Sequence, residues 1–442
     1  MWPDPRRSLT ILRLAGPIIS GMLSQSLLNL VDAALVGRLG EVALAGVGLG
    51  GYAMFIVTAL VFGLSSGVQA QTAWRQGECA EAERGRALNA GLAIAVIVAL
   101  PLSLVCLWQA PRLLALLTQQ QAVHEVAVAY FRWRVVALLA VAICCCFRGY
   151  WNGVQQTAIY LRIVLATHLV NVLASAGLIF GLAGLPRLGA AGAGAGSAIA
   201  VSTAALAWAA YTARAKGPSA FSWQWPSLTA LRATLALAVP HSLQQLCFAA
   251  GYAVLFAILG QLGTASVAVG HVLVNLSLLL ILPGVGLGVA AMSLVGQSLG
   301  RATPDEAHRW GWDVVRVAWL ALALPALPML AFPEAVLGLF LYEPALVELG
   351  HAALQLTALM IVLDAAAIVL GQALLGAGAN RTVMGVTLAL QWLVFLPLAW
   401  WCGVALGYGL LGIWWMQLAY RCLNSLSFAW IWQRRRWQQL VL

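Results

Sequence analysis

The chain has 442 residues, of which 62% are hydrophobic and only 9% are charged. Soluble domains carry about 25% charged residues, and the mean hydropathy of +0.90 excludes an ordinary soluble protein. Apolar runs of about 20 residues, the length that crosses a bilayer as a helix, recur along the whole sequence. The composition therefore predicts an all-α integral membrane protein.

Twelve transmembrane helices are predicted in chain order, each centred on one apolar run. Their approximate ranges are 10–36, 43–72, 88–110, 124–147, 157–183, 190–213, 229–260, 265–298, 312–332, 347–375, 382–403 and 408–432. A transmembrane β-barrel would instead show alternating segments of about 10 residues.

The net charge of +10 is distributed unevenly between the two sides of the membrane. Of the 24 Lys and Arg residues, nineteen fall on the side that holds both chain ends. Only Arg38, Arg112 and Arg187 fall on the other side, while Arg132 and Arg134 lie in the fourth span. Because cytoplasmic loops are rich in Lys and Arg, we expect a multi-pass protein of a bacterial-type inner membrane with both termini cytoplasmic. The charge requires no nucleic-acid partner.

Many of the 19 Trp residues lie at the ends of predicted spans. They are Trp74, Trp108, Trp223, Trp225, Trp310, Trp312, Trp430, Trp432 and Trp437. Trp is enriched at membrane–water interfaces, so we expect an interfacial belt, with a cation-binding aromatic cage as the alternative for a few of them.

An internal repeat appears when the sequence is shifted, without a gap, so that Pro17 falls on Pro240. The same shift pairs Gly37 with Gly260, Gly63 with Gly286 and Arg86 with Arg309. Each half then holds six spans, so both halves insert in the same orientation. We expect an N-terminal six-helix lobe over 1–215, a cytoplasmic linker over 216–228 and a C-terminal six-helix lobe over 229–442. Transporters built from such repeats bind substrate and coupling ions near the membrane midplane.

Two carboxylates, Asp32 and Asp364, lie inside predicted spans, whereas the other twelve acidic residues lie in or beside polar connectors. An ionisable residue within the membrane is expensive and is a functional-site hypothesis by default. The repeat places Leu255 opposite Asp32 and Val141 opposite Asp364. The two acids are therefore not the halves of one symmetric site.

Asp32 shares one helical face with Gln25 and Asn29, because the three are spaced i, i+4, i+7. Their amides donate to an ionised carboxylate or accept from a protonated one, which favours an ion-coupling site. A polar seam that only joins helices is the alternative. On the fifth span, Asn171 and Ser175 follow His168 in a similar stripe, a candidate second wall of the same pocket.

A second group of polar and aromatic residues is predicted to contact substrate. The group consists of Asp32, Asp364, Gln244, Tyr52, His271 and Asn275. For Asp364, a structural carboxylate bonded to the backbone or to a Gln is the alternative. No phosphate-binding loop, metalloprotease motif or nucleophile elbow occurs, so we expect no enzyme and no cofactor beyond a coupling ion.

Several segments together resemble the multidrug and toxic compound extrusion (MATE) family over nearly the whole chain. They are Leu14–Pro17, Asn29–Gly40, Phe147–Gly149, Gly270–Asn275, Pro283–Gly288, Leu294–Gly300 and Gly376–Gly378. The resemblance implies twelve helices in two lobes around a V-shaped cleft, and efflux of organic cations and other xenobiotics in exchange for H⁺ or Na⁺.

The resemblance also assigns roles to single residues. Asp32 and Asn171 match the first-helix Asp and fifth-helix Asn of the family's N-lobe ion site, and Ser175 stands where some members carry an acid. Asp364 matches the tenth-helix Asp of NorM-like members, whose seventh-helix acid is Phe248 here. The chain therefore shares one acid with each pattern, and the resemblance leaves a DinF-like and a NorM-like subgroup open.

The leading hypothesis is a monomeric secondary antiporter that exports lipophilic or cationic xenobiotics by alternating access. Asp32 would bind the coupling H⁺ or Na⁺, and Asp364 would attract cationic substrates or hold a second ion. The alternative is a lipid-linked precursor flippase of a related two-lobe fold, which should line its cavity with several basic residues. Only Arg132 and Arg134 are candidates for that role. A channel is a third class, which the repeat disfavours.

Overall fold

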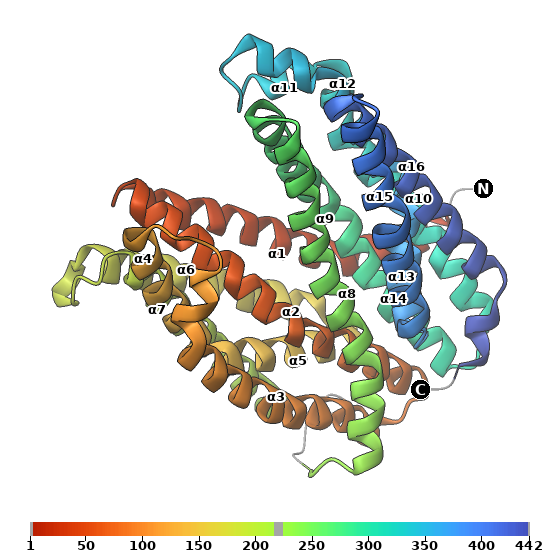
Figure 1. The fold of residues 1–442 in the computed structure, drawn as a ribbon. Helices are drawn as coiled ribbons and strands as arrows, with labels where there is room; N and C mark the ends of the chain where they lie inside the picture. Colours follow the sequence, from red (N-terminus) through yellow and green to blue (C-terminus); the bar gives the residue numbers. More distant parts are fainter. Residues whose placement is uncertain (1–2, 216–223, 441–442) are drawn as a thin grey trace. The chain divides into compact units, whose positions relative to one another are not determined.

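The computed structural model describes residues 3–215 and 224–440, except for the side chains of residues 81–84. Every regular element in these ranges is helical (Figure 1), which confirms the predicted all-α membrane fold. Residues 216–223 of the predicted linker lie outside the described residues.

The first half of the chain contains seven α-helices and one short 3₁₀ turn. They are α1 (Pro5–Gly37), α2 (Glu41–Gly77), α3 (Glu81–Ala115), α4 (Gln121–Val136), α5 (Leu138–Gly153), α6 (Thr157–Phe180), η1 (Leu182–Gly184) and α7 (Ala190–Arg214). The fourth predicted span is broken at Ala137 into α4 and α5, which meet at an angle of 48°.

The second half repeats this order with more interruptions. Its elements are α8 (Leu228–Gln261), α9 (Thr264–Gly300), α10 (Pro304–Ala331), α11 (Pro333–Leu337), α12 (Pro344–Leu363), α13 (Ala365–Gly376), α14 (Asn380–Leu388), η3 (Ala389–Phe395), α15 (Leu396–Trp400), η4 (Trp401–Ala405), α16 (Gly409–Gln433) and η5 (Arg436–Gln439). The segments η3 and η4 are π-helical.

Ten helices in the described part of the chain are long and apolar enough to cross a membrane, or eleven if α4 and α5 form one span. Helix α16 coincides with the twelfth predicted span but is not among them. Its sequence explains this, because Gln417, Arg421 and Asn424 lower the hydropathy of its central turns.

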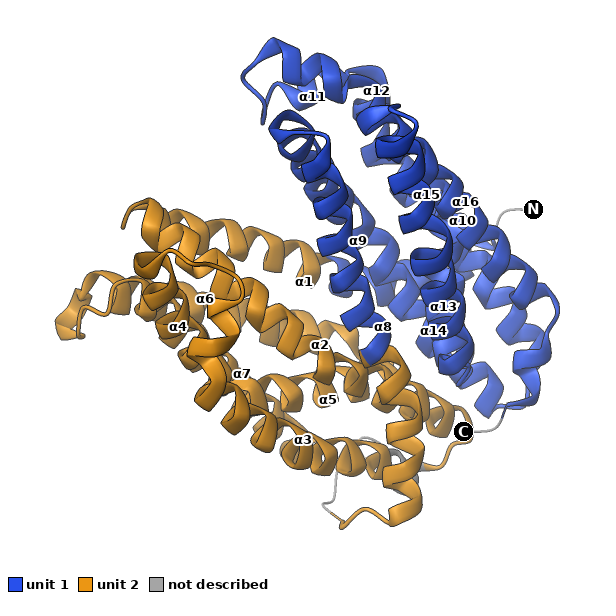
Figure 2. Ribbon diagram, viewed as in Figure 1, with its two compact units in different colours: residues 1–19, 243–442 blue, residues 20–242 orange. Residues whose placement is uncertain are grey.

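The chain forms two compact units (Figure 2). Unit 2 contains residues 20–242, and unit 1 contains residues 1–19 and 243–442. The two boundaries are separated by the same offset as Pro17 and Pro240, so they follow the sequence repeat. Each boundary lies just after one of these prolines, in α1 or in α8. Helices α1 and α8 therefore each contribute to both units. The predicted lobes, divided along the chain at 216–228, stay a prediction.

The repeat is visible in the backbone where each half makes its first tight turn. Gly40 and Gly263 precede α2 and α9 with φ values of 104° and 108°. A residue with a Cβ atom rarely adopts such a conformation, whereas glycine does so readily. Both positions of the repeat therefore require glycine.

A serine hydroxyl joins α8 to α2 within unit 2. The Gly63 amide donates to Ser242 Oγ over 3.0 Å, and the Ser242 hydroxyl donates to the Leu60 carbonyl over 2.8 Å. This close approach requires the missing side chain at Gly63, where a Cβ atom would collide with Ser242. In unit 1, a Cβ atom on the repeat-related Gly286 would likewise collide with Ile19.

Glycines also bring α7 against α6, which carries the predicted stripe. A Cβ atom on Gly196 would meet the backbone of Ser175, and one on Gly192 would meet the backbone of Leu178. The two helices therefore touch through their backbones, and the polar side chains between them are enclosed.

The exposure that an interfacial belt requires is found for only part of the predicted Trp set. Trp108, Trp225 and Trp430 are exposed, as a belt requires. In contrast, Trp74, Trp310, Trp432 and Trp437 are buried inside the protein. They pack because an indole buries a large apolar area; the Trp432 and Trp437 rings stack with centroids 4.0 Å apart. Trp223 lies outside the described residues.

We predict opposite effects for two Gly→Ala substitutions in helices. Gly196→Ala should destabilise unit 2 by about 1–3 kcal/mol because the methyl group overpacks the contact with Ser175. Gly48→Ala is the matched control, because nothing lies within 4 Å of its Cβ position, and alanine favours a helix by about 1 kcal/mol. Thermal unfolding in detergent measures both, and equal shifts would contradict the described packing.

Candidate functional site

The predicted stripe on α1 forms one polar face in unit 2. Gln25 Nε2 donates to Asn29 Oδ1 over 3.3 Å, and both side chains are exposed. Asp32, one turn further, is half-buried, and its Oδ1 atom is buried without a hydrogen-bond partner. The apolar contacts of Val36 with Tyr130 and Ile179 fix the end of the helix just after Asp32.

His168 on α6 joins this stripe from the side. Its Nε2 atom lies 3.1 Å from Gln25 Oε1, and its Nδ1 atom lies 3.1 Å from Ser24 Oγ. Ser24 Oγ is also 3.0 Å from the Gly21 carbonyl oxygen. The i, i+3, i+7 spacing of His168, Asn171 and Ser175 predicts that they share one helical face. Of these three residues, His168 is the one with a described contact to α1.

Both protonation states of His168 fit these distances. In the neutral ring, Nε2–H donates to Gln25 Oε1 and Nδ1 accepts from the Ser24 hydroxyl. In the charged ring, Nδ1–H donates to Ser24 Oγ, whose own hydrogen turns to the Gly21 carbonyl oxygen. The imidazole therefore gains or loses a proton without leaving either ring nitrogen unsatisfied.

Arg134 supplies the positive charge next to Asp32. It lies in the last turn of α4, directly before the break at Ala137, and acts electrostatically on the Asp32 carboxylate. Its buried Nε atom has no hydrogen-bond partner. Among the described ion pairs there is none between the two residues, so Asp32 has a nearby cation but no closed salt bridge. Arg132 is exposed.

Asn171 and Ser175 form a separate buried network. The Ser175 hydroxyl donates to Asn171 Oδ1 over 3.2 Å, and Asn171 Nδ2 donates to Ser197 Oγ of α7 over 3.1 Å. All three side chains are buried. The predicted ion-coupling set is thus divided: Gln25 and Asn29 lie in the network of His168, while no described hydrogen bond connects Asn171 or Ser175 to it.

The second intramembrane acid, Asp364 in unit 1, is paired. It lies at the junction of α12 and α13 with 2% of its surface exposed, and its Oδ2 atom is 2.5 Å from Arg421 Nη1 of α16. Arg421 also lies over the ring of Tyr420 at 5.7 Å. Arg421 is one of the nineteen basic residues counted on the cytoplasmic side, but the structure places it in the central turns of α16, where it is the counter-ion of a buried carboxylate.

A serine of α16 forms hydrogen bonds with the backbone where α12 ends and α13 begins. The Ser425 hydroxyl donates to the Leu363 carbonyl over 2.7 Å, and the Ala367 amide donates to Ser425 Oγ over 3.2 Å. The hydroxyl thus replaces the helical bond between Ala367 and Leu363, a known cause of helix bending. Arg421 and Ser425, one turn apart on α16, both contact this junction.

A small cavity of about 20 Å³ adjoins this pair. Tyr252, Arg421 and two glutamines, Gln391 and Gln417, line it. The Oε1 atoms of both glutamines are buried without a hydrogen-bond partner. A cavity of about 10–15 Å³ or more holds a water molecule when polar groups face it, so this space has room and acceptors for about one water.

No described hydrogen bond joins the remaining predicted substrate residues to either acid. Gln244 Nε2 donates to Thr387 Oγ1 over 3.2 Å, so its amide bonds to α14 rather than to Asp364. On α9, Asn275 Nδ2 donates to the His271 carbonyl over 2.9 Å, and both side chains are exposed. Tyr52 on α2 is 37% exposed. Their contact with substrate stays a prediction.

Comparison with known proteins places this all-helical membrane protein among the transporters. The sequence profile of the MatE family matches twice, at residues 17–176 and 240–401. The two matches begin at Pro17 and Pro240, the pair that defines the sequence repeat, which confirms it. The chain belongs to the MatE family and is a MATE transporter.

Curated relatives carry the name NorM. The chain is 28% identical to the probable multidrug resistance protein NorM of Pseudomonas aeruginosa, over 92% of this chain and 85% of that protein. It is also 28% identical to the protein of the same name in Pseudomonas putida, over 96% and 94%. These matches support the NorM-like subgroup of the two that the resemblance left open.

A solved structure confirms the fold. The outward-facing structure of a multidrug resistance MATE family transporter of the MOP superfamily superposes with a TM-score of 0.91 at 20% identity, over 98% of this chain and 97% of that one.

We predict strong coupling between Asp364 and Arg421 in a double-mutant cycle. Arg421→Met leaves a buried carboxylate unpaired and should destabilise the protein by about 3–5 kcal/mol, whereas Asp364→Leu combined with Arg421→Met should restore much of that loss. Thermal unfolding in detergent measures all variants. If the two single losses simply add in the double variant, the described ion pair is wrong.

Proposed function

We propose that this MATE transporter is a multidrug efflux antiporter, which exports lipophilic or cationic compounds in exchange for H⁺ by alternating access. The names of its relatives support the multidrug substrate class. The chain's own residues support the site of ion coupling. We further propose that the protein works as a monomer in the inner membrane with both termini cytoplasmic. The distribution of basic residues favours this orientation, at eighteen to three once Arg421 is counted inside α16.

The observation that carries the ion-coupling assignment is the difference between the two acids. Asp364 is neutralised by Arg421, which holds a permanent charge. Each acid has one buried carboxylate oxygen without a hydrogen-bond partner, but Asp32 differs in having no closed ion pair, since Arg134 acts on it only as a nearby charge. A carboxylate that binds and releases an ion in each transport cycle must be free of a permanent ion pair, as Asp32 is. We therefore assign coupling to Asp32 and a structural role to Asp364, in place of a second ion site.

His168 favours H⁺ over Na⁺ as the coupling ion. Its ring is connected through Gln25 to Asn29, one turn from Asp32, and its bonds suit both the neutral and the charged state. Histidine is the side chain that ordinarily changes charge between about pH 5 and 8, whereas a Na⁺ site would gain nothing from a neighbouring imidazolium. Proton transfer at this face would change the charge of the α1–α6 contact and so bias the conformation of unit 2.

The substrate side of the proposal rests on the polar residues that the structure leaves exposed. Tyr52, His271 and Asn275 present exposed polar groups on mainly apolar helices. Gln244 is half-buried, and its buried Oε1 atom has no hydrogen-bond partner. A mainly apolar wall with a few polar groups suits lipophilic organic ions. The V-shaped cleft that such substrates would enter remains part of the proposal.

We predict that Asp32→Asn abolishes coupled transport. In proteoliposomes, an imposed H⁺ gradient should drive efflux of a fluorescent lipophilic cation such as ethidium by the wild type, while a Na⁺ gradient alone should not. The Asn variant should lose dye-dependent H⁺ flux, because its amide cannot be protonated. Asp364→Leu with Arg421→Met is the matched control, which keeps the net charge and should retain H⁺ coupling.

Two results would contradict this assignment. The first is wild-type H⁺ coupling in Asp32→Asn. The second is efflux driven by Na⁺ alone. Movement of a lipid-linked precursor analogue without dye efflux would favour the flippase alternative.

We predict a further effect for His168→Gln. Glutamine keeps a donor toward Gln25 but does not titrate in this range, so dye efflux should become less dependent on pH between about 5 and 8. His351→Gln is the control, because His351 is a half-buried residue of α12 in unit 1, with its Nδ1 atom 3.4 Å from Glu334 Oε1. A pH profile identical to that of the wild type would show that His168 is only a packing residue.

A further inference from the structure

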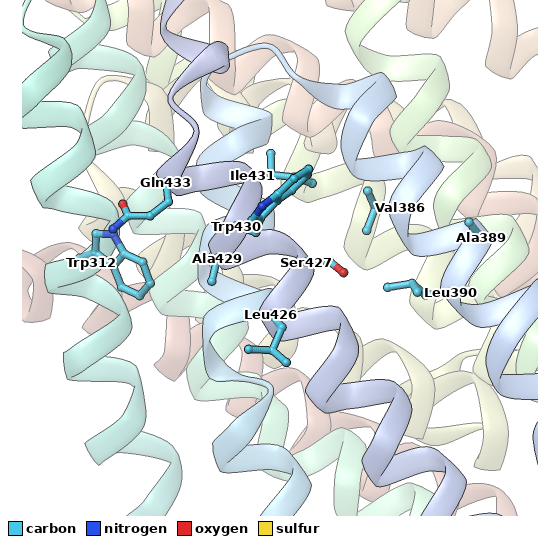
Figure 3. A pocket seen from close by; sticks show the side chains of 10 residues that line it. All are labelled: Trp312, Val386, Ala389, Leu390, Leu426, Ser427, Ala429, Trp430, Ile431 and Gln433. Atoms are coloured by element: carbon cyan, nitrogen blue, oxygen red, sulfur yellow. The ribbon is translucent and has the colours of Figure 1, made fainter.

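Unit 1 carries a large groove along α16 that no part of the proposed transport cycle uses. We call it the α16 groove; it has a volume of about 820 Å³, within the range of about 300–1,000 Å³ typical of ligand sites. Its walls come from α10, from the junction of α14 with η3, and from the last turns of α16. Figure 3 shows Trp430 between Trp312 on one side and Val386 on the other.

The wall of the α16 groove is almost entirely apolar. Leu390, Leu426, Ile431 and the two tryptophans provide hydrocarbon and aromatic surface, and Ser427 adds one hydroxyl (Figure 3). The amide of Gln433 is already engaged, since His308 Nε2 lies 2.8 Å from its Oε1 atom. Such a wall suits a hydrocarbon chain rather than a polar solute.

The end of the α16 groove is cationic. The Arg434 guanidinium lies 3.6 Å from the centre of the Trp430 ring, so a positive charge covers a residue of the wall. Arg436 follows and is exposed. On α10, Arg309 is exposed and precedes Trp312 by one helical turn on the same face.

The neighbouring acids do not cancel this charge. Asp305 is paired with Arg435 over 2.6 Å. The Glu306 carboxylate accepts a hydrogen bond from Trp310 Nε1 over 3.2 Å and is half-buried. We therefore define the cationic rim of the groove as Arg434, which covers Trp430, together with the exposed Arg309 and Arg436, which lie close to wall residues in the sequence. The described residues show no ion pair for any of these three arginines.

From this combination we infer that the α16 groove is a binding site for an anionic phospholipid. One acyl chain lies along the apolar wall, and the phosphate of the headgroup lies at the cationic rim. Guanidinium groups bind phosphate well because their paired donors match its oxygens, and basic pockets beside membrane helices attract anionic headgroups. The positive charge of the rim and the negative charge of the phosphate are complementary. This distinguishes the groove from apolar surface that any membrane lipid would cover.

Such a lipid would contact the elements that hold the buried ion pair in place. The groove wall includes Ala389 and Leu390 of η3, and the next residue, Gln391, packs against Gly251 beside the small cavity. It also includes the last turns of α16, whose central turn carries Arg421. Binding in the groove therefore stabilises the arrangement of η3 and α16. The inference does not rest on the direction of transport or on the coupling ion.

The test is a titration of the full-length protein in detergent with phosphatidylglycerol or phosphatidylcholine, with bound lipid counted by native mass spectrometry. Phosphatidylglycerol should bind more tightly and raise the unfolding temperature. Arg434→Gln and Arg436→Gln should each weaken it by about five-fold, since a basic residue near a membrane surface contributes about that factor. Arg187→Gln, an exposed arginine of unit 2, is the matched control and should have no effect.

A second pair of variants tests the apolar wall. Ser427→Trp fills the α16 groove and should remove the tight phosphatidylglycerol site, whereas Ala419→Trp should leave it intact, because Ala419 is an exposed residue of α16 outside the groove. If Ser427→Trp fails to fold, the arginine variants still decide the matter.

Three results would overturn the inference. Equal affinity for the two lipids would contradict it. So would unchanged binding in the arginine variants, or tight phosphatidylglycerol binding by a folded Ser427→Trp variant.

Discussion

The need to compensate a charge inside an apolar span decides how both units of this transporter are built. A charged side chain at the centre of a membrane helix is unfavourable by about 2.5–3.5 kcal/mol even on the most permissive scale. Asp364 meets this requirement with Arg421, and the pair joins the α12–α13 junction to α16. Asp32 meets it only in part, because Arg134 is near but forms no described ion pair with it. The closed Asp364–Arg421 pair is suited to a structural role, and the Asp32 carboxylate is suited to binding and releasing a coupling ion.

The same scaffold therefore carries different chemistry in its two halves. The sequence repeat fixes the turns before α2 and α9, the close helix contacts at Gly63 and Gly286, and the boundaries of the compact units. It does not fix the polar residues, since Leu255 occupies the position of Asp32 in the second half. Backbone packing tolerates few residue types, whereas a polar face changes at little cost to the fold.

Much of the fold and part of the candidate site could be predicted from the sequence. Each predicted span coincides with helical residues, although ten or eleven of the twelve are long and apolar enough to cross a membrane in the described part of the chain. The i, i+4, i+7 spacing placed Gln25, Asn29 and Asp32 on one face. The partner of Asp364 could not be found this way, because Arg421 is 57 residues away and resembles the other basic residues near the end of the chain. An arginine in the middle of a predicted span was the available signal. Likewise, span ends do not reveal that Trp432 and Trp437 stack inside the protein.

The central claim is that Asp32 exchanges a proton while Asp364 keeps its counter-ion. The most direct measurement is the proton release of purified, detergent-solubilised protein in weak buffer when a lipophilic cation is added. Wild type and the Asp364→Leu, Arg421→Met double variant should both release protons, and Asp32→Asn should release none. Undiminished proton release from Asp32→Asn would contradict this account.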